Sequence, residues 1–84
     1  MRKVGKPDSK VTLLFTYDAD HINHIVYSVG RDEKGNCYSV EEHEYNIGST
    51  YSVCRDYYLL EASELEALRL KAKARGTGEH PDLK

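Results

Sequence analysis

The chain has 84 residues, 39% of them hydrophobic and 31% charged, and its formal net charge is −2 at pH 7. This composition is typical of one small globular domain and excludes a disordered chain, while a domain of this size has little room for a deep substrate cleft. The longest apolar run, residues 11–15 with Thr12 inside it, is too short for a membrane span or a signal peptide, so we expect a cytoplasmic protein with no membrane partner.

The N-terminal segment, residues 1–10, is basic, because it carries four cationic side chains and one acidic residue. It also contains Gly5 and Pro7 and almost nothing apolar, so it has little to pack against a core. Chain termini of this kind are usually loose. We therefore predict a flexible basic arm at residues 1–10, a single folded domain at residues 11–76 and a flexible tail at residues 77–84.

Three strands are predicted, at residues 11–17, 22–29 and 37–44. In the first of them, apolar and aromatic residues at alternate positions share one face of the strand. A polar stretch that includes a glycine and an asparagine separates the second strand from the third and predicts a hairpin loop.

The phrase Tyr-Ser-Val occurs three times in the chain, at residues 27–29, 38–40 and 51–53. Aromatic and β-branched residues around a small polar one are typical of half-buried strands. The third copy lies in residues 51–60, which fit two structures. A helix would group Val53, Tyr57 and Leu60 on one side, whereas a strand would repeat the pattern of the earlier copies. We favour the strand because the segment is rich in tyrosine and valine.

Ser63 and Glu66 form the pattern of a capping box for a C-terminal helix, and Gly76 is a natural stop. Two apolar stripes follow the 3.6-residue period on nearly opposite sides of this helix. The first stripe, which we expect to cover the sheet, consists of Leu65, Leu68 and Ala72. The second stripe, which would suit self-association into a homodimer, consists of Ala67, Leu70 and Ala74. Together these elements predict an α+β fold, a small antiparallel meander of three to four strands with one C-terminal helix packed on one face.

Two groups of residues have the chemistry of a metal or active site. Residues 18–24 gather two carboxylates and two imidazoles, which suit a divalent transition metal. However, His21 and His24 would point to opposite faces of a strand and no further ligand cluster accompanies them, so we favour a polar turn. His43 and Cys54 are the one pair of base and nucleophile, but no recognisable catalytic motif surrounds either residue. We therefore predict no catalytic residue, no metal site, no cofactor and no enzymatic activity.

The two cysteines, Cys37 and Cys54, are expected to be reduced in a cytoplasmic protein. Unpaired cysteines of this kind usually behave as small, partly buried hydrophobic residues. The sequence leaves a disulfide open, because the two residues would be able to pair if their strands were neighbours.

The strongest charged feature of the chain is acidic. Residues 11–62 hold nine acidic side chains against three basic ones. Three of the acidic side chains and two tyrosines lie in or beside the third predicted strand: Tyr38, Glu41, Glu42, Glu44 and Tyr45. Such charges discourage aggregation at a solvated strand edge. They also suit docking, since a tyrosine buries a large apolar area in an interface and keeps a hydroxyl for a polar partner.

We therefore predict a small, non-enzymatic protein-binding module that is inhibitor- or adaptor-like. Its acidic, Tyr-rich sheet or edge would engage a basic site on a partner protein, for example one that handles nucleic acids. The alternative is direct nucleic-acid binding through residues 1–10 and the basic end of the helix, which carries Arg69, Lys71, Lys73 and Arg75. Phosphate contacts need lysine and arginine, so the acidic sheet argues against nucleic acid as a direct ligand.

Overall fold

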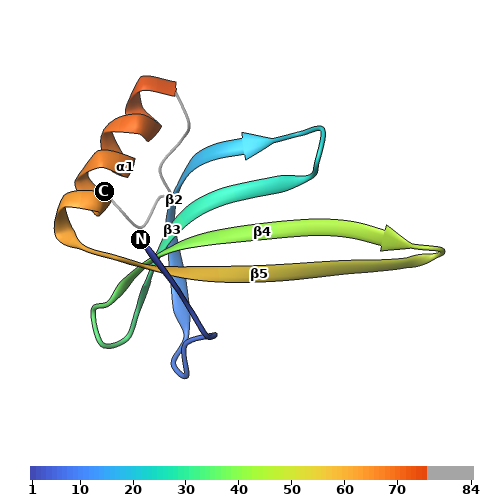
Figure 1. Cartoon of the computed structure of the whole chain (residues 1–84), viewed down its shortest axis with the longest axis horizontal. Helices are drawn as coiled ribbons and strands as arrows, with labels where there is room; N and C mark the ends of the chain where they lie inside the picture. Colours follow the sequence, from blue (N-terminus) through green and yellow to red (C-terminus); the bar gives the residue numbers. More distant parts are fainter. Residues whose placement is uncertain (76–84) are drawn as a thin grey trace.

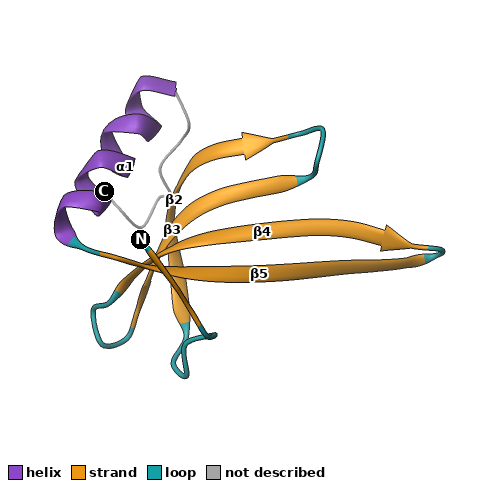
Figure 2. Ribbon diagram, in the orientation of Figure 1, coloured by secondary structure: helices purple, strands orange, loops and turns teal. Residues whose placement is uncertain are grey.

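The structure, a computed structural model of the chain, describes residues 1–75. Five strands and one helix follow one another: β1 (Arg2–Val4), β2 (Val11–Asp20), β3 (Ile25–Asp32), β4 (Cys37–Ile47), β5 (Thr50–Leu60) and α1 (Ala62–Arg75). The strands form one antiparallel sheet in the order β1-β5-β4-β3-β2, and α1 packs against β2 (Figure 1). Figure 2 shows short loops between long strands. The predicted α+β class is confirmed, but the prediction of three to four strands is wrong, because there are five.

The additional strand is β1, which lies within the predicted flexible arm, residues 1–10. Its three residues pair antiparallel with residues 57–59 of β5. Val4 is the only apolar residue of β1, so the segment carries no strand pattern of its own, and the edge of β5 supplies its backbone partners. The favoured strand at residues 51–60 is confirmed as part of β5. The predicted tail, residues 77–84, lies outside the described residues.

Residues 18–24 form the end of β2 and the turn into β3. The Asp20 carboxylate accepts hydrogen bonds from the backbone amides of Ile22 (3.1 Å) and Asn23 (3.0 Å), and from the side chain of Asn23 (2.7 Å). His24 ends the turn with a φ of +56°, in the left-handed region. The hydrogen bonds of the Asp20 carboxylate therefore stabilise the turn, which agrees with the interpretation of this segment as a polar turn.

One face of the sheet packs against α1. The buried side chains of this core come from three strands and the helix: Leu14, Phe15, Tyr17, Val29, Leu60 and Ala72. Leu65 and Leu68 pack against them, which confirms that the first apolar stripe of the helix covers the sheet. The pairing of β2 with β3 shifts register between Leu13 and Phe15. Such a β-bulge explains how the consecutive residues Leu14 and Phe15 both reach the core.

The helix begins earlier than the predicted capping box of Ser63 and Glu66. The Glu64 side chain accepts a hydrogen bond from the backbone amide of Glu61 (3.1 Å), and the amide of Leu65 donates to the carbonyl of Glu61 (2.9 Å). Glu61 is therefore the N-cap and Glu64 the third helical residue, so the predicted start was wrong by two residues. Among residues 1–75, no helix has the length and apolar content needed to cross a bilayer.

A second apolar cluster lies on the opposite face of the sheet. Its buried members are Tyr38, Val40 and Tyr57, and the partly buried side chains packed on them are Val4, Val11, Leu13 and Leu59. Val4 and Val11 flank residues 5–10, a short connection between the two outer strands of the sheet. Side chains of both outer strands, Val4 of β1 and Val11 and Leu13 of β2, therefore pack on the second cluster. The sheet therefore has a core on both faces, where the sequence predicted only one.

Asp32 is a buried carboxylate at the turn between β3 and β4, with 7% of its surface exposed. It accepts hydrogen bonds from the Tyr38 hydroxyl (2.8 Å) and from the backbone amides of Lys34 and Asn36 (2.9 Å each). Burial opposes ionisation, but these hydrogen bonds outweigh it and lower the pKa of Asp32 below its usual value. The carboxylate thus ties the turn to the second apolar cluster through Tyr38.

Replacing Phe15 with alanine should remove the largest fully buried side chain of the helix-side core. We expect the free energy of unfolding to fall by about 3–5 kcal/mol, because the ring is lost and a cavity remains. Urea denaturation followed by circular dichroism measures this change. The control is Leu70→Ala, which removes an exposed leucine and should change stability by less than about 0.5 kcal/mol. Equal effects of the two substitutions would contradict the assignment of the core.

The substitution Asp32→Asn should lower the denaturation midpoint at pH 7. Because the folded-state pKa of Asp32 is depressed, its contribution to stability is complete above the unfolded pKa of about 3.9 and is lost as the pH falls through the folded pKa. The stability difference between wild type and variant should therefore shrink below about pH 4. Urea titrations at a series of pH values measure it, with Glu33→Gln in the same loop as the control. A difference independent of pH would count against this role of the carboxylate.

Candidate functional site

β4 and β5 pair with each other along their entire lengths, but the flanking strands β3 and β1 pair with only part of them. β3 pairs with β4 only as far as His43, and β1 pairs with β5 only along residues 57–59. Beyond these points, residues 44–56 form a two-stranded ribbon that projects from the body, to the right in Figure 1. We call residues 44–56 the hairpin arm. Its two-residue turn begins with Gly48, whose φ of +63° favours glycine.

The hairpin arm exposes four large apolar or aromatic side chains: Tyr45 (45%), Ile47 (67%), Tyr51 (60%) and Val53 (44%). Strand alternation places Tyr45 and Ile47 on one face of the ribbon, and Tyr51 and Val53 on the other. In the remainder of residues 1–75, the large apolar side chains exposed to this degree are Met1, Ile22 and Leu70. A two-stranded ribbon is marginal on its own in water, and clustered apolar exposure is typical of a contact surface.

A groove runs between the hairpin arm and the turn that joins β2 to β3. Its lining residues are Ile22, Asn23, His24, Glu44, Tyr45, Asn46 and Tyr51. The backbone amide of Glu44 donates to the carbonyl of His24 (3.0 Å), so one hydrogen bond links the hairpin arm to the turn just before β3. Partial desolvation and the Glu44 carboxylate raise the pKa of Tyr51. On the face of the ribbon that carries Tyr51, the groove therefore brings a phenol close to the Glu44 carboxylate.

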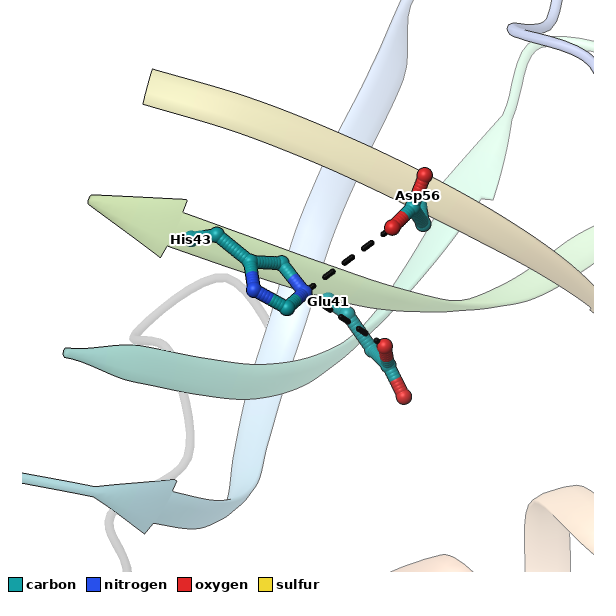
Figure 3. Close-up of side chains that lie close together, drawn as sticks. All are labelled: Glu41, His43 and Asp56. Atoms are coloured by element: carbon teal, nitrogen blue, oxygen red, sulfur yellow. Dashed lines mark ion pairs between the residues drawn. The ribbon is translucent and has the colours of Figure 1, made fainter. Parts of the chain in front are cut away.

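Three titratable side chains meet at the base of the hairpin arm, Glu41 and His43 from β4 and Asp56 from β5 (Figure 3). The His43 Nε2 atom lies 3.6 Å from Glu41 Oε2 and 3.8 Å from Asp56 Oδ2. All three side chains are partly buried, with 28–35% of their surface exposed. We call Glu41, His43 and Asp56 the base cluster. The Lys3 ammonium of β1 lies 3.7 Å from the other oxygen of Asp56.

The base cluster lies on the face of the sheet that carries α1, beside two phenols. Burial raises the pKa of Tyr17 and of Tyr27, and the Glu41 carboxylate raises both further. The Tyr17 hydroxyl is hydrogen-bonded to Ser39 Oγ at 2.5 Å. The Glu41 carboxylate thus acts electrostatically on both phenols and also lies beside the His43 imidazole.

The predicted partner-binding residues do not form one surface. Tyr38 is buried, so its ring is not available to a partner without rearrangement. Glu41 lies on the face with α1, whereas Glu42 and Glu44 lie on the opposite face, because successive strand residues alternate. Glu42 accepts a hydrogen bond from Arg55 Nε (2.7 Å), so its charge is paired. Tyr45 is exposed on the hairpin arm, as a docking residue requires.

Sequence reasoning missed Asp56 as a neighbour of Glu41. The sequence signal that could have found this pair is a two-residue turn at residues 48–49. Counting residues outward from this turn along both strands places Glu41 directly opposite Asp56, and His43 directly opposite Cys54. The base and nucleophile pair considered from the sequence is thus adjacent in the sheet. However, His43 Nε2 is directed at the two carboxylates, which Figure 3 shows.

The two cysteines are free and lie far apart. Cys37 pairs with Leu60 and Cys54 pairs with His43, so six residues of strand separate them along β4. That separation is about 20 Å, whereas a disulfide needs Cα atoms closer than about 7 Å. The fold therefore excludes the intramolecular disulfide that the sequence left open.

The predicted self-association residues, Ala67, Leu70 and Ala74, are exposed. Self-association through them stays a prediction. The basic end of the helix is partly engaged within the protein: the Lys71 ammonium lies 3.5 Å from Asp18, and the Arg69 guanidinium lies 5.1 Å from the centre of the Phe15 ring.

Comparison of the chain with protein-family models, with curated proteins and with solved structures finds no match.

Alkylation should distinguish the two cysteines. Cys54 is exposed on the hairpin arm, whereas Cys37 is partly buried against the helix-side core. We expect iodoacetamide to modify Cys54 several-fold faster than Cys37 in the folded protein, since access limits the rate. Peptide mass spectrometry after timed quenching measures both rates, and the same reaction in urea is the control in which the difference should disappear. Faster modification of Cys37 would contradict the placement of the arm.

Proposed function

We propose that the protein is a non-enzymatic protein-binding module, inhibitor- or adaptor-like, that binds a partner protein through the hairpin arm. The observation that carries this proposal is the exposure of Tyr45, Ile47, Tyr51 and Val53 on a ribbon that projects from the body. The helix-side core and the second apolar cluster lie outside the ribbon, so these side chains do not stabilise the fold from within. Aromatic side chains on a pre-formed strand bury a large area on binding at low entropic cost.

The charges near the hairpin arm favour a partner with a basic surface. Glu44 lies in the groove beside Tyr51, and Glu41 and Asp56 lie at the base of the arm. Within the arm Arg55 is the one basic residue, and it is hydrogen-bonded to Glu42. Complementary charge would steer a basic protein to this surface. A protein whose basic site handles nucleic acid has this chemistry.

The proposal changes the set of residues that we expect to bind the partner. Glu44 and Tyr45 are retained from the sequence prediction, and the other exposed residues of the arm, Ile47, Tyr51 and Val53, are added. Tyr38 is omitted because it is buried, and Glu42 because Arg55 neutralises it. Glu41 contributes charge at the base of the arm, on the face that carries Tyr45 and Ile47.

The alternative function is direct nucleic-acid binding through residues 1–10 and the basic end of α1. Part of that charge is balanced within the protein, since Lys3 pairs with Asp56 and Lys71 pairs with Asp18. Such pairs would have to be given up before phosphate could be bound. This balance favours the protein partner over nucleic acid.

A photoreactive amino acid at position 47 should cross-link the partner in a lysate of the source cells, and the partner can then be purified. Binding of this partner should weaken about 30-fold or more in Tyr51→Ala, because a central aromatic anchor is lost. Glu44→Lys should mainly slow association and reduce its dependence on salt. Surface plasmon resonance measures both effects.

Leu70→Ala on the exposed face of α1 is the matched control and should bind as the wild type does. The proposal would be contradicted by a partner that binds Tyr51→Ala and wild type equally. It would also fail if the protein bound generic duplex DNA with an affinity that falls steeply with salt, which is the signature of phosphate contacts.

A further inference from the structure

We propose that the base cluster, Glu41, His43 and Asp56, is a binding site for a divalent transition-metal ion, with Zn²⁺ as the best match to its ligands. This inference needs no second protein, so its test does not use the partner, although Glu41 and Asp56 also supply negative charge in the partner-binding proposal. It also departs from the expectation of no metal site that the sequence analysis reached.

Two like charges face each other in the base cluster. Glu41 and Asp56 lie directly opposite each other on adjacent antiparallel strands, and both carboxylates are partly buried. Like charges in directly opposed positions destabilise a sheet, and partial burial reduces the screening by water. A cation between the two oxygens would turn this repulsion into attraction.

The His43 imidazole has an unsatisfied nitrogen that faces these two carboxylates. Its Nε2 atom is shielded from solvent and makes no hydrogen bond to any of the described residues, although two carboxylates face it. A charge-assisted hydrogen bond would be about 2.7–2.9 Å long, whereas the observed separations are 3.6 and 3.8 Å. The imidazole is therefore directed at the carboxylates without bonding to either.

These separations suit ligands that share one metal ion. With Zn–N and Zn–O bonds of about 2.0–2.2 Å, two ligand atoms of a tetrahedral site lie about 3.4 Å apart. In the base cluster the ligand atoms all lie within 4.8 Å of one another, so adjustments of less than a bond length would bring them to these distances. Imidazole nitrogen with carboxylate oxygen is a ligand set that Zn²⁺ accepts, and two carboxylates balance its charge.

A bound ion would connect β4 to β5 at the base of the hairpin arm. Glu41 and His43 belong to β4 and Asp56 belongs to β5, so the ion would hold the two strands together where their neighbours stop accompanying them. The Lys3 ammonium, 3.7 Å from Asp56, is a competing cation. The Lys3 side chain is 64% exposed and flexible, so its ammonium can move away when a metal binds.

Calorimetric titration of the full chain with Zn²⁺ alone, in a buffer that does not chelate metals at pH 7.5, tests the site. The chain has four histidines, which allows a matched pair of variants. His43→Ala removes only the proposed ligand, whereas the triple variant His21→Ala/His24→Ala/His80→Ala leaves His43 as the only histidine. Circular dichroism verifies that each variant is folded.

We expect one Zn²⁺ per chain for the wild type and for the triple variant. In His43→Ala the affinity should fall by at least the roughly 10–100-fold that the loss of an outer-shell group typically costs. Glu41→Gln should weaken binding similarly, and Lys3→Ala should bind at least as tightly as the wild type, since a competing cation is gone. In the triple variant, the Nε2 nitrogen resonance of His43 should shift when Zn²⁺ is added.

Three results of the titrations would overturn the proposal. They are the absence of stoichiometric binding to the wild type, undiminished binding in His43→Ala, and loss of binding in a folded triple variant. A resonance of His43 that does not respond to saturating Zn²⁺ would overturn it as well, without depending on the fold of any ligand variant.

Discussion

The pairing of β4 with β5 along eleven residues is the constraint on which the site depends. Because the register is continuous from the two-residue turn to the body, it determines which side chains share a face and which lie opposite each other. It places Glu41 against Asp56 at the base and exposes Ile47 near the tip. A shift by one residue would transfer every side chain of β5 to the other face and would dismantle both features.

The body of the protein and the hairpin arm differ in what stabilises them. In the body, α1 covers one face of the sheet and side chains of the outer strands pack on a cluster on the other, so both faces are packed. The arm is held by the cross-strand hydrogen bonds between β4 and β5, by the hydrogen bond from the Glu44 amide to the His24 carbonyl, and by surface pairs such as Glu42 with Arg55 and Lys3 with Asp56. A surface pair of this kind contributes about 0–1 kcal/mol. The hairpin arm is therefore the part of the sheet that an additional contact would stabilise most, whether a protein binds at its tip or an ion binds at its base.

The local sequence pattern was sufficient to predict the elements whose residue pattern is typical of a helix or a strand. The stripe of Leu65, Leu68 and Ala72 predicted the buried side of α1, and the tyrosine- and valine-rich residues 51–60 predicted a strand. Pattern failed for β1, which is a strand because β5 offers an unpaired edge and not because of its own residues. It failed also for the acidic surface, where adjacent carboxylates were treated as neighbours although a strand directs them to opposite faces.

The repeated phrase Tyr-Ser-Val shows which property the sequence determines, the strand conformation, and which the tertiary structure determines, the burial of each side chain. From sequence alone, aromatic and β-branched residues determined that residues 27–29 and 51–53 both lie in strands. Only the tertiary structure decided that Val29 is fully buried while Val53 is 44% exposed. Backbone conformation follows from the residues of the segment itself, whereas burial depends on what packs above it. Val29 lies in the helix-side core, and Val53 lies on a ribbon that extends beyond the strands flanking it.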